Sequence, residues 1–283
     1  MNITTHSAGL GLRRALLSTL EQQTSAEIDF MELVPENWLG VGGQLGKKLR
    51  YFTERYPFVA HGLSLNLGGF TPLDQAFLQR LKHFLKTHQV LHYTEHLSYC
   101  GDEGHLYDLM PIPFTEEAIK HVVARIKQTQ DILEQRIAIE NISYYAAPSK
   151  AMNEITFINA ILEDADCNLL LDVNNIYVNS INHDYDAAMF LKSLPKSRIV
   201  YAHIAGHYQE EEDFIIDTHG AKVIDPVWQL LDEAYRHFGI FPTLLERDFN
   251  IPTLSELLKE VDIIANKQSQ FSAQEAHTHV QSF

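Results

Sequence analysis

The sequence has little cysteine, little positive charge and no long apolar run. Its 283 residues include only two cysteines, Cys100 and Cys167. Two thiols are too few for a disulfide framework or a thiolate metal site. We therefore expect both cysteines to be reduced and structural, in a reducing compartment.

Lysine and arginine total 22, against 37 aspartates and glutamates, which gives a formal charge of −15. This balance argues against binding to a nucleic-acid backbone, which needs clustered basic side chains. No apolar run approaches the ~20 residues of a membrane span. The first twenty residues also lack the basic region and apolar stretch of a signal peptide. We expect a soluble, cytoplasmic protein without a membrane or nucleic-acid partner.

A glycine-rich phosphate fingerprint is missing as well. Gly9-Leu-Gly11 precedes a helical pattern without a clear strand before it, and Gly40-Val-Gly42-Gly43 falls in a loop. A doubly wound nucleotide-binding sheet is therefore disfavoured.

What the chain does contain is an alternation of short β-type runs and longer helical patterns. Helix starts are indicated at Thr71-Pro72, Thr115-Glu116, Asp225-Pro226 and the capping box Thr253-x-x-Glu256. The predicted strands are 28–34, 58–65, 90–97, 136–141, 168–173, 198–204, 213–217 and 243–247.

Eight strands with intervening helices, at this length, predict an α/β fold of the (β/α)8 TIM-barrel type in a single domain. We assign residues 1–267 to the barrel and 268–283 to a polar C-terminal tail. In such a barrel, functional residues gather at the carboxyl ends of the strands.

Ionisable residues follow the apolar runs at those ends. Glu140, Asp172 and Glu246 close the runs RIAIE, NLLLD and TLLE, and buried carboxylates are costly unless paired or metal-bound. Histidines lie at equivalent positions. The candidate metal ligands are His61, His96, Glu140, Asp172, His203, Asp217, His219 and Glu246.

One ion takes four to six ligands, so eight candidates indicate either outer partners among them or two to three ions. Histidine and carboxylate without cysteine suit iron, manganese or zinc, and suit calcium poorly. Residues beside the ligands are expected to be further ligands or near neighbours; these are His207, Glu36, Asn141, Arg247 and Asp248.

These motifs, taken in order, resemble a known family. They are His61-Gly-Leu-Ser, Glu95-His96-Leu-Ser, Glu140-Asn-Ile-Ser, Asp172-Val-Asn-Asn175, His203-Ile-Ala-Gly-His207, Asp217-Thr-His219 and Glu246-Arg-Asp248. They resemble the multinuclear non-haem iron-dependent oxidases, formerly grouped as a domain of unknown function. The best-known member of that family acts in methanobactin biosynthesis. The resemblance spans roughly residues 7–265.

The resemblance implies a TIM barrel of the xylose-isomerase-like type that holds two or three iron ions (Fe2+/Fe3+) on the eight candidate ligands. It also implies that Asn175 lies beside them as a further ligand or near neighbour. It also implies an oxidoreductase that uses dioxygen to modify residues, often cysteines, of a ribosomally made precursor peptide. A small partner protein commonly presents the leader of that peptide. No catalytic residue apart from the metal ligands is assigned.

Two other interpretations of the function remain open. One is a different divalent-metal barrel enzyme, either a sugar isomerase or a phosphodiesterase of the endonuclease type. The acidic balance disfavours the phosphodiesterase, and the absence of lysine at the predicted strand ends disfavours the isomerase. The other is a metal-binding protein without turnover. The peptide, the modification, the number of metals and the oligomeric state do not follow from the sequence.

Overall fold

The computed structural model describes residues 2–23, 27–101 and 104–280. Eight strands form a closed barrel in the order β1-β12-β9-β8-β7-β4-β3-β2, and helices alternate with these strands along the chain. The predicted (β/α)8 barrel is therefore confirmed. The chain groups into two compact units: unit 1 comprises residues 1–32, 172–192 and 201–283, and unit 2 comprises residues 33–171 and 193–200.

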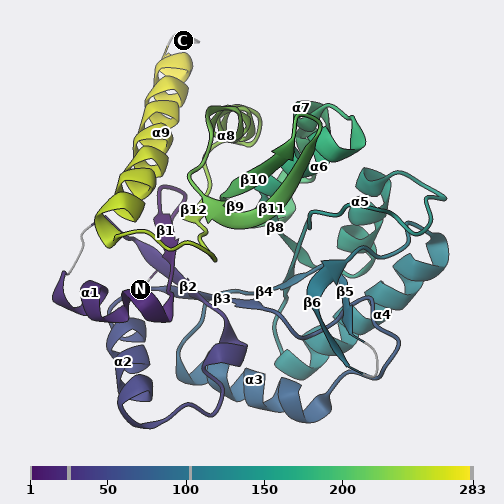
Figure 1. The fold of residues 1–283 in the computed structure, drawn as a ribbon, viewed down its shortest axis with the longest axis horizontal. Coiled ribbons are helices and arrows are strands. Elements are labelled where there is room, and N and C mark those ends of the chain that lie inside the picture. The colour runs from purple at the N-terminus through teal and green to yellow at the C-terminus, as the bar shows by residue number, and fades with distance from the viewer. Residues whose placement is uncertain (1, 24–26, 102–103, 281–283) are drawn as a thin grey trace. The chain divides into compact units, whose positions relative to one another are not determined.

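Unit 1 contains the first and last parts of the chain. Its strands are β1 (Ala8–Gly11), β2 (Phe30–Leu33), β9 (Ile199–Ile204), β10 (Gly206–Glu211), β11 (Phe214–Ala221) and β12 (Thr243–Leu245). The last residue of β2, Leu33, and the first two of β9 belong to unit 2. The helices of unit 1 are α1 (Leu17–Gln22), α6 (Val173–His183), α7 (Ala187–Lys192), α8 (Asp225–Phe238) and α9 (Leu254–Val280). Figure 1 labels these elements.

Unit 2 contains the middle of the chain. Its strands are β3 (Phe58–Gly62), β4 (Tyr93–His96), β5 (Tyr99–Gly101), β6 (His105–Met110), β7 (Ala138–Glu140) and β8 (Asn168–Asp172). The last residue of β8, Asp172, belongs to unit 1. The helices of unit 2 are α2 (Gly43–Thr53), α3 (Gln75–Thr87), α4 (Glu116–Leu133) and α5 (Glu154–Asp164). Short 3-10 turns at Arg14–Leu16, Pro35–Asn37 and Lys196–Arg198 complete the chain.

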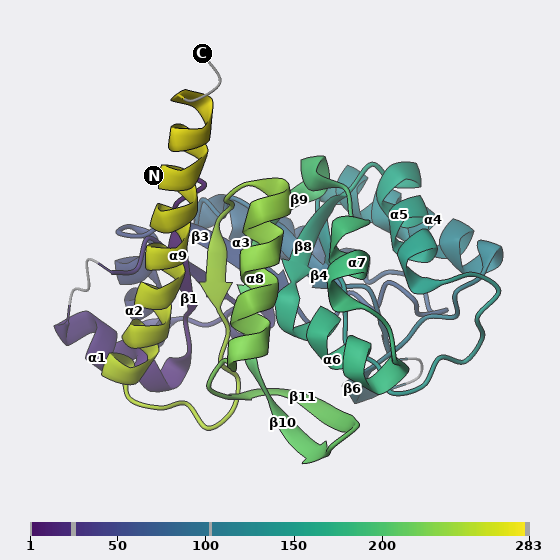
Figure 2. The same cartoon turned by 90° about the horizontal axis from the view of Figure 1, so that it is seen from above.

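One predicted barrel strand was wrong. The run 213–217 belongs to β11, which pairs antiparallel with β10 in a separate two-stranded ribbon (Figure 2). The remaining barrel strand is β1, which pairs in parallel with both β2 and β12. Glycine is required in β1, because a Cβ on Gly9 would lie only 2.5 Å from the ring of Phe30. The same glycine conceals the strand in the sequence, since glycine is depleted in strands.

Helix starts in unit 2 follow from side-chain caps. Thr115 caps α4 as expected, because its side chain accepts a hydrogen bond from the backbone N–H of Ala118. The helix start predicted at Thr71-Pro72 lies a few residues too early. Helix α3 begins at Gln75, and the side chain of Asp74 caps it by accepting a hydrogen bond from the backbone N–H of Phe77. Both helices bury one apolar face, which for α3 consists of Leu78, Leu81, Phe84 and Leu85.

The last helix, α9, continues through the segment expected to be a polar tail, as far as Val280. Gln268 lies on this helix and is buried. Its amide donates to the backbone oxygens of Phe241 (3.0 Å) and Ser7 (3.3 Å). These bonds join α9 to the residues that precede β12 and β1. Among the described residues, no helix has the length and apolar character needed to cross a bilayer.

Candidate metal centre

In unit 2, three predicted ligands lie at the ends of neighbouring strands. His61 is in β3, His96 ends β4 and Glu140 ends β7. The parallel register places His61 opposite Thr94 and His96 opposite Glu140. Because successive side chains on a strand alternate between faces, this register brings the three polar side chains to one place.

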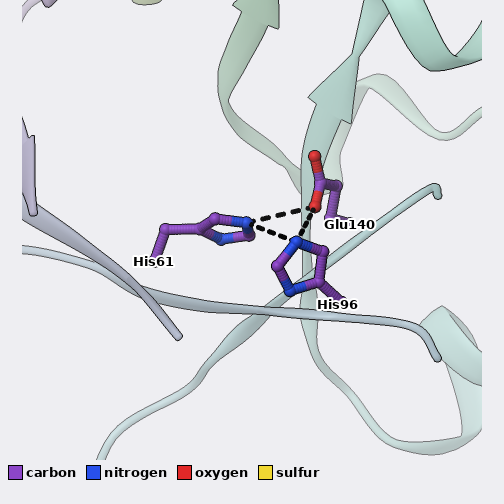
Figure 3. Close-up of side chains that lie close together, drawn as sticks. All are labelled: His61, His96 and Glu140. Atoms are coloured by element: carbon purple, nitrogen blue, oxygen red, sulfur yellow. Dashed lines mark hydrogen bonds and ion pairs between the residues drawn. The ribbon is translucent and has the colours of Figure 1, made fainter. Parts of the chain in front are cut away.

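We call His61, His96 and Glu140 the unit 2 ligand group. The two Nε2 atoms of His61 and His96 are 3.0 Å apart, and each lies 3.2 Å from Oε2 of Glu140 (Figure 3). His61 and Glu140 are buried, whereas His96 is partly exposed. The group therefore combines enclosed donor atoms with one accessible side.

The outer hydrogen bonds of both rings determine which nitrogen carries the proton. Nδ1 of His96 is 3.0 Å from the backbone oxygen of Gly62, and a carbonyl oxygen only accepts, so Nδ1–H is the donor. Nδ1 of His61 is 2.7 Å from Oγ1 of Thr94, and that hydroxyl lies 3.4 Å from the oxygen of Ala60, to which it donates. In the neutral rings, both lone pairs are therefore on Nε2.

This arrangement fits a metal ion. Two nitrogen lone pairs and one carboxylate oxygen face each other at about 3 Å, where they repel one another unless a cation lies between them. Metal-bound histidines usually donate their other N–H to an oxygen in this way. The nitrogen and oxygen donors suit iron, manganese or zinc.

In unit 1, a second set of predicted residues comes together. Asp172 ends β8 and also caps α6, where its Oδ1 accepts from the backbone N–H of Asn175 at 2.6 Å. Nδ1 of His203, in β9, lies 2.9 Å from Oε2 of Glu246 and 3.8 Å from Oδ2 of Asp172. All three of these side chains are buried.

His219, on β11, extends this set. Its Nδ1 lies 3.1 Å from Glu246 Oε2 and 3.3 Å from Asp248 Oδ2, and its Nε2 lies 2.8 Å from Asp217 Oδ1. The unit 1 ligand group is therefore Asp172, His203, Asp217, His219, Glu246 and Asp248. The backbone of His219 has a φ of 47°, a left-handed conformation that is uncommon outside glycine and frequent at functional sites.

Charge coupling within this group is strong. Burial alone would lower the pKa of His219, but the carboxylates of Asp217 and Glu246 outweigh it and hold that pKa well above its usual value. Burial alone would raise the pKa of Glu246, but His203 and His219 hold it well below its usual value. The group therefore stabilises positive charge at its centre, which is a property that a cation site requires.

Two further residues support the group from outside. Nε2 of His203 donates to Oε2 of Glu32 at 2.8 Å, and the hydroxyl of Tyr201 donates to the same oxygen at 2.6 Å. The guanidinium of Arg13 pairs with Asp248, lies 3.4 Å from Oε1 of Glu246, and donates from Nε to the backbone oxygen of Arg247.

Three of the residues predicted to lie beside the ligands, His207, Asn175 and Arg247, are in unit 1. Nδ1 of His207 lies 2.8 Å from Oδ1 of Asn174, whose Nδ2 donates to Oδ1 of Asp217 at 2.9 Å. His207 therefore reaches the unit 1 ligand group through Asn174. Asn175 is buried beside Asp172. The side chain of Arg247 points to α9 instead, where it donates to Glu260 at 2.8 Å.

In unit 2, Glu36 supports the loop after β3, because its Oε1 accepts from the backbone N–H groups of Leu63 (2.8 Å) and Ser64 (2.9 Å). Burial and the nearby carboxylate of Glu95 raise the pKa of Glu36. Asn141 is buried directly after Glu140 and lines a small cavity with Tyr144 and Glu154.

Arg13 and Glu32 contact the unit 1 ligand group but are not among the predicted ligands and neighbours. Glu32 is a carboxylate near the end of the predicted strand 28–34, which is a usable signal, although Leu33 and Val34 continue the apolar run beyond it. Arg13 follows β1, the strand that was not recognised, and its partner Asp248 lies 235 residues further along the chain. No local pattern connects the two.

Comparisons with known proteins agree with this architecture. A structure of 3-keto-D-glucoside 4-epimerase from E. coli is similar in fold, with a TM-score of 0.60 and 12% identity over 92% of this chain and 98% of that one. A xylose isomerase domain protein from Alicyclobacillus acidocaldarius gives a TM-score of 0.58 and 15% identity over 94% and 98%. The fold is therefore that of a xylose-isomerase-like TIM barrel.

Sequence relatives are much closer. A UPF0276 protein of Nitrosospira multiformis is 61% identical over 263 residues, which is 93% of each chain. The family model described as "RiPP precursor modification enzyme MbnB/TglH/ChrH" matches residues 7–269, where RiPP denotes a ribosomally synthesised and post-translationally modified peptide. The chain belongs to the MbnB/TglH/ChrH family of RiPP precursor modification enzymes.

Proposed function

We propose that the protein is a multinuclear non-haem iron-dependent oxidase that uses dioxygen to modify cysteines of a ribosomally made precursor peptide. The observation that carries the proposal is the pair of histidine–carboxylate groups, one in each unit. Membership of a family of precursor-peptide-modifying enzymes supplies the class of substrate. A small partner protein that binds the leader of the peptide completes the proposed system.

The proposal assigns His61, His96 and Glu140 to one ion. Asp172, His203, Asp217, His219 and Glu246 are assigned to one or two more. Iron is proposed because imidazole and carboxylate donors suit it and because the chemistry is oxidative; manganese and zinc are the alternatives that the same donors accept. Asp172 and His203 are completely buried, which keeps water away from these two side chains of the unit 1 ligand group.

When bound, iron would supply redox chemistry and a Lewis acid that favours the thiolate form of a substrate cysteine. The residues of the chain do the positioning. Thr94 and the backbone oxygen of Gly62 orient the two rings of the unit 2 ligand group. Glu32 orients His203, and Arg13 offsets the negative charge of Glu246 and Asp248. Partly exposed His96 marks a side from which substrate can approach the unit 2 ligand group.

The test is anaerobic reconstitution of the full chain with Fe2+, followed by mass spectrometry of the precursor peptide encoded beside the gene. We expect a mass change that requires both iron and dioxygen, and increases when the partner protein is added. Equal product without dioxygen or without iron would refute the oxidase.

Metal analysis of the protein as isolated separates the competing readings. Bound iron supports the oxidase, whereas manganese or magnesium together with sugar isomerisation supports the isomerase. A protein that binds iron but leaves the precursor peptide and dioxygen unchanged under all conditions supports a metal-binding protein without turnover.

A further inference from the structure

Unit 2 contains a groove that the proposed metal chemistry does not use. It has a volume of about 560 Å³ and lies along α2, α3 and the loop that precedes α2. Its apolar lining includes Trp38, Leu49 and Phe84, all of which are largely buried. The groove lies outside the unit 2 ligand group, since none of His61, His96 and Glu140 lines it.

Glycine shapes one wall of the groove. A Cβ on Gly46 would lie 2.8 Å from the backbone oxygen of Val41, so only glycine lets the loop approach α2 this closely. Gly40 and Gly43 have φ values of 76° and 61°, and a Cβ on either would meet no atom within 4 Å. The loop therefore turns sharply, and the space beside its backbone is open.

The charge of the groove is opposite to that of the chain. Its charged lining residues are Arg50 on α2 and Arg80 on α3, and its lining includes no carboxylate. Within the described part of the chain, neither arginine has an ion pair. In a protein with a formal charge of −15, two unpaired arginines beside an apolar floor form a local site for negative charge.

We propose that this groove docks an acidic amphipathic helix of a partner protein. Apolar side chains of that helix would contact Leu39 and Val41, which line the groove and are partly exposed, and its carboxylates would pair with Arg50 and Arg80. The two arginines come from different helices that form the groove, which suits a guest helix with apolar anchors flanked by acids. The proposal concerns a second surface, and it does not depend on the metal chemistry.

The test measures binding of two synthetic probes to the full chain, as isolated, by fluorescence anisotropy. One probe is a 14-residue helical peptide with a leucine face flanked by glutamates, and the other has lysines in place of the glutamates. The formal charge of the chain, −15, opposes binding of the acidic probe. We expect the acidic probe to bind more tightly, despite this overall repulsion.

Variants locate the binding. We expect Arg50→Glu and Arg80→Glu each to weaken the acidic probe by about tenfold, as expected for loss of one charge-assisted contact. Arg55→Glu is the matched control: Arg55 follows α2, stacks on Tyr51 outside the groove, and its change should alter affinity less than twofold. Circular dichroism melting establishes that each variant is folded.

Four results would overturn the proposal. The first is tighter binding of the lysine probe, and the second is equal weakening by Arg50→Glu and Arg55→Glu. The third is a self-associating chain that Arg50→Glu makes monomeric in sedimentation, which would assign the groove to a second copy. Displacement of the acidic probe by millimolar pyrophosphate but not by matched salt would assign the arginines to a small anion, and would likewise overturn the proposal.

Discussion

Glu32 accepts a hydrogen bond from Nε2 of His203 at 2.8 Å, and both side chains are completely buried. Because Nε2 is the donor, the lone pair of the neutral ring is on Nδ1, the atom that faces Glu246 and Asp172. Glu32 therefore determines which nitrogen of His203 can bind a cation. Tyr201 holds the carboxylate in place through the same oxygen.

Replacing Glu32 by glutamine should weaken metal binding in the unit 1 ligand group. The amide keeps the volume of the side chain but removes the charge that strengthens the His203 bond. We expect roughly 10- to 100-fold weaker binding, which is typical for loss of such an outer partner. The measurement is iron retained per chain during titration with a competing chelator.

The matched control is Glu163→Gln, which makes the same chemical change at an exposed position of α5. It should retain iron like the parent protein. Equal iron retention in Glu32→Gln and Glu163→Gln would show that Glu32 has no role in holding His203 for a metal.

Replacing His96 by alanine should remove one of three converging donors in the unit 2 ligand group. The loss of affinity should exceed the roughly 10- to 100-fold expected for an outer partner, because a ligand itself is lost. The iron content of the chain should fall by about one ion, as measured by inductively coupled plasma mass spectrometry. His237→Ala, an exposed change on α8, is the control, and unchanged iron content in His96→Ala would contradict the assignment.

The parts of the site that the sequence predicted are those with a local signal. Glu140 and Asp172 each end an apolar run, so strand periodicity alone placed them at strand ends. The unit 1 and unit 2 ligand groups then follow, because a parallel barrel gathers functional residues at those ends. Which ions bind, and how many, stays a prediction.

The parts that were missed depend on long-range packing. A two-residue alternation describes the hairpin strand β11 as well as a barrel strand, so the run 213–217 was assigned to the wrong sheet. β1 has four residues, two of them glycine, and its identity as a strand comes from pairing with β2 and β12. Arg13 was lost with it, although its ionic partners place it beside the unit 1 ligand group.

Replacing Gly9 by alanine tests the packing of β1. The added Cβ would lie 2.5 Å from the ring of Phe30, so the ring or the strand must move. Overpacking of this kind costs about 1–3 kcal/mol, and we expect that decrease in the free energy of unfolding, measured by urea denaturation.

Gly104→Ala is the control, because a Cβ there would meet nothing within 4 Å. It should change the free energy of unfolding by less than about 0.5 kcal/mol, which is usual for an exposed position. If the two variants are equally stable, the close approach of Phe30 to β1 is not a constraint on the fold.

Glu154 provides a pH test that is independent of the metal groups. Burial raises its pKa to about 7, even though the hydroxyl of Tyr144 donates to its Oε2 at 3.0 Å. A carboxyl whose pKa is higher in the folded state binds more protons there than in the unfolded state, so stability falls as the pH rises. The decrease begins near the ordinary carboxyl pKa of about 4.5 and is complete above about pH 7.

Glu154→Gln should remove this dependence, because the amide does not titrate. Relative to the parent protein, we expect the variant to gain on the order of 2 kcal/mol between pH 5 and pH 8. Urea denaturation at both pH values gives the difference, and exposed Glu163→Gln on the same helix should follow the parent protein. If the parent protein and Glu154→Gln lose stability in parallel over this range, another group is responsible, and the Glu154 carboxyl is ionised in the folded protein at neutral pH.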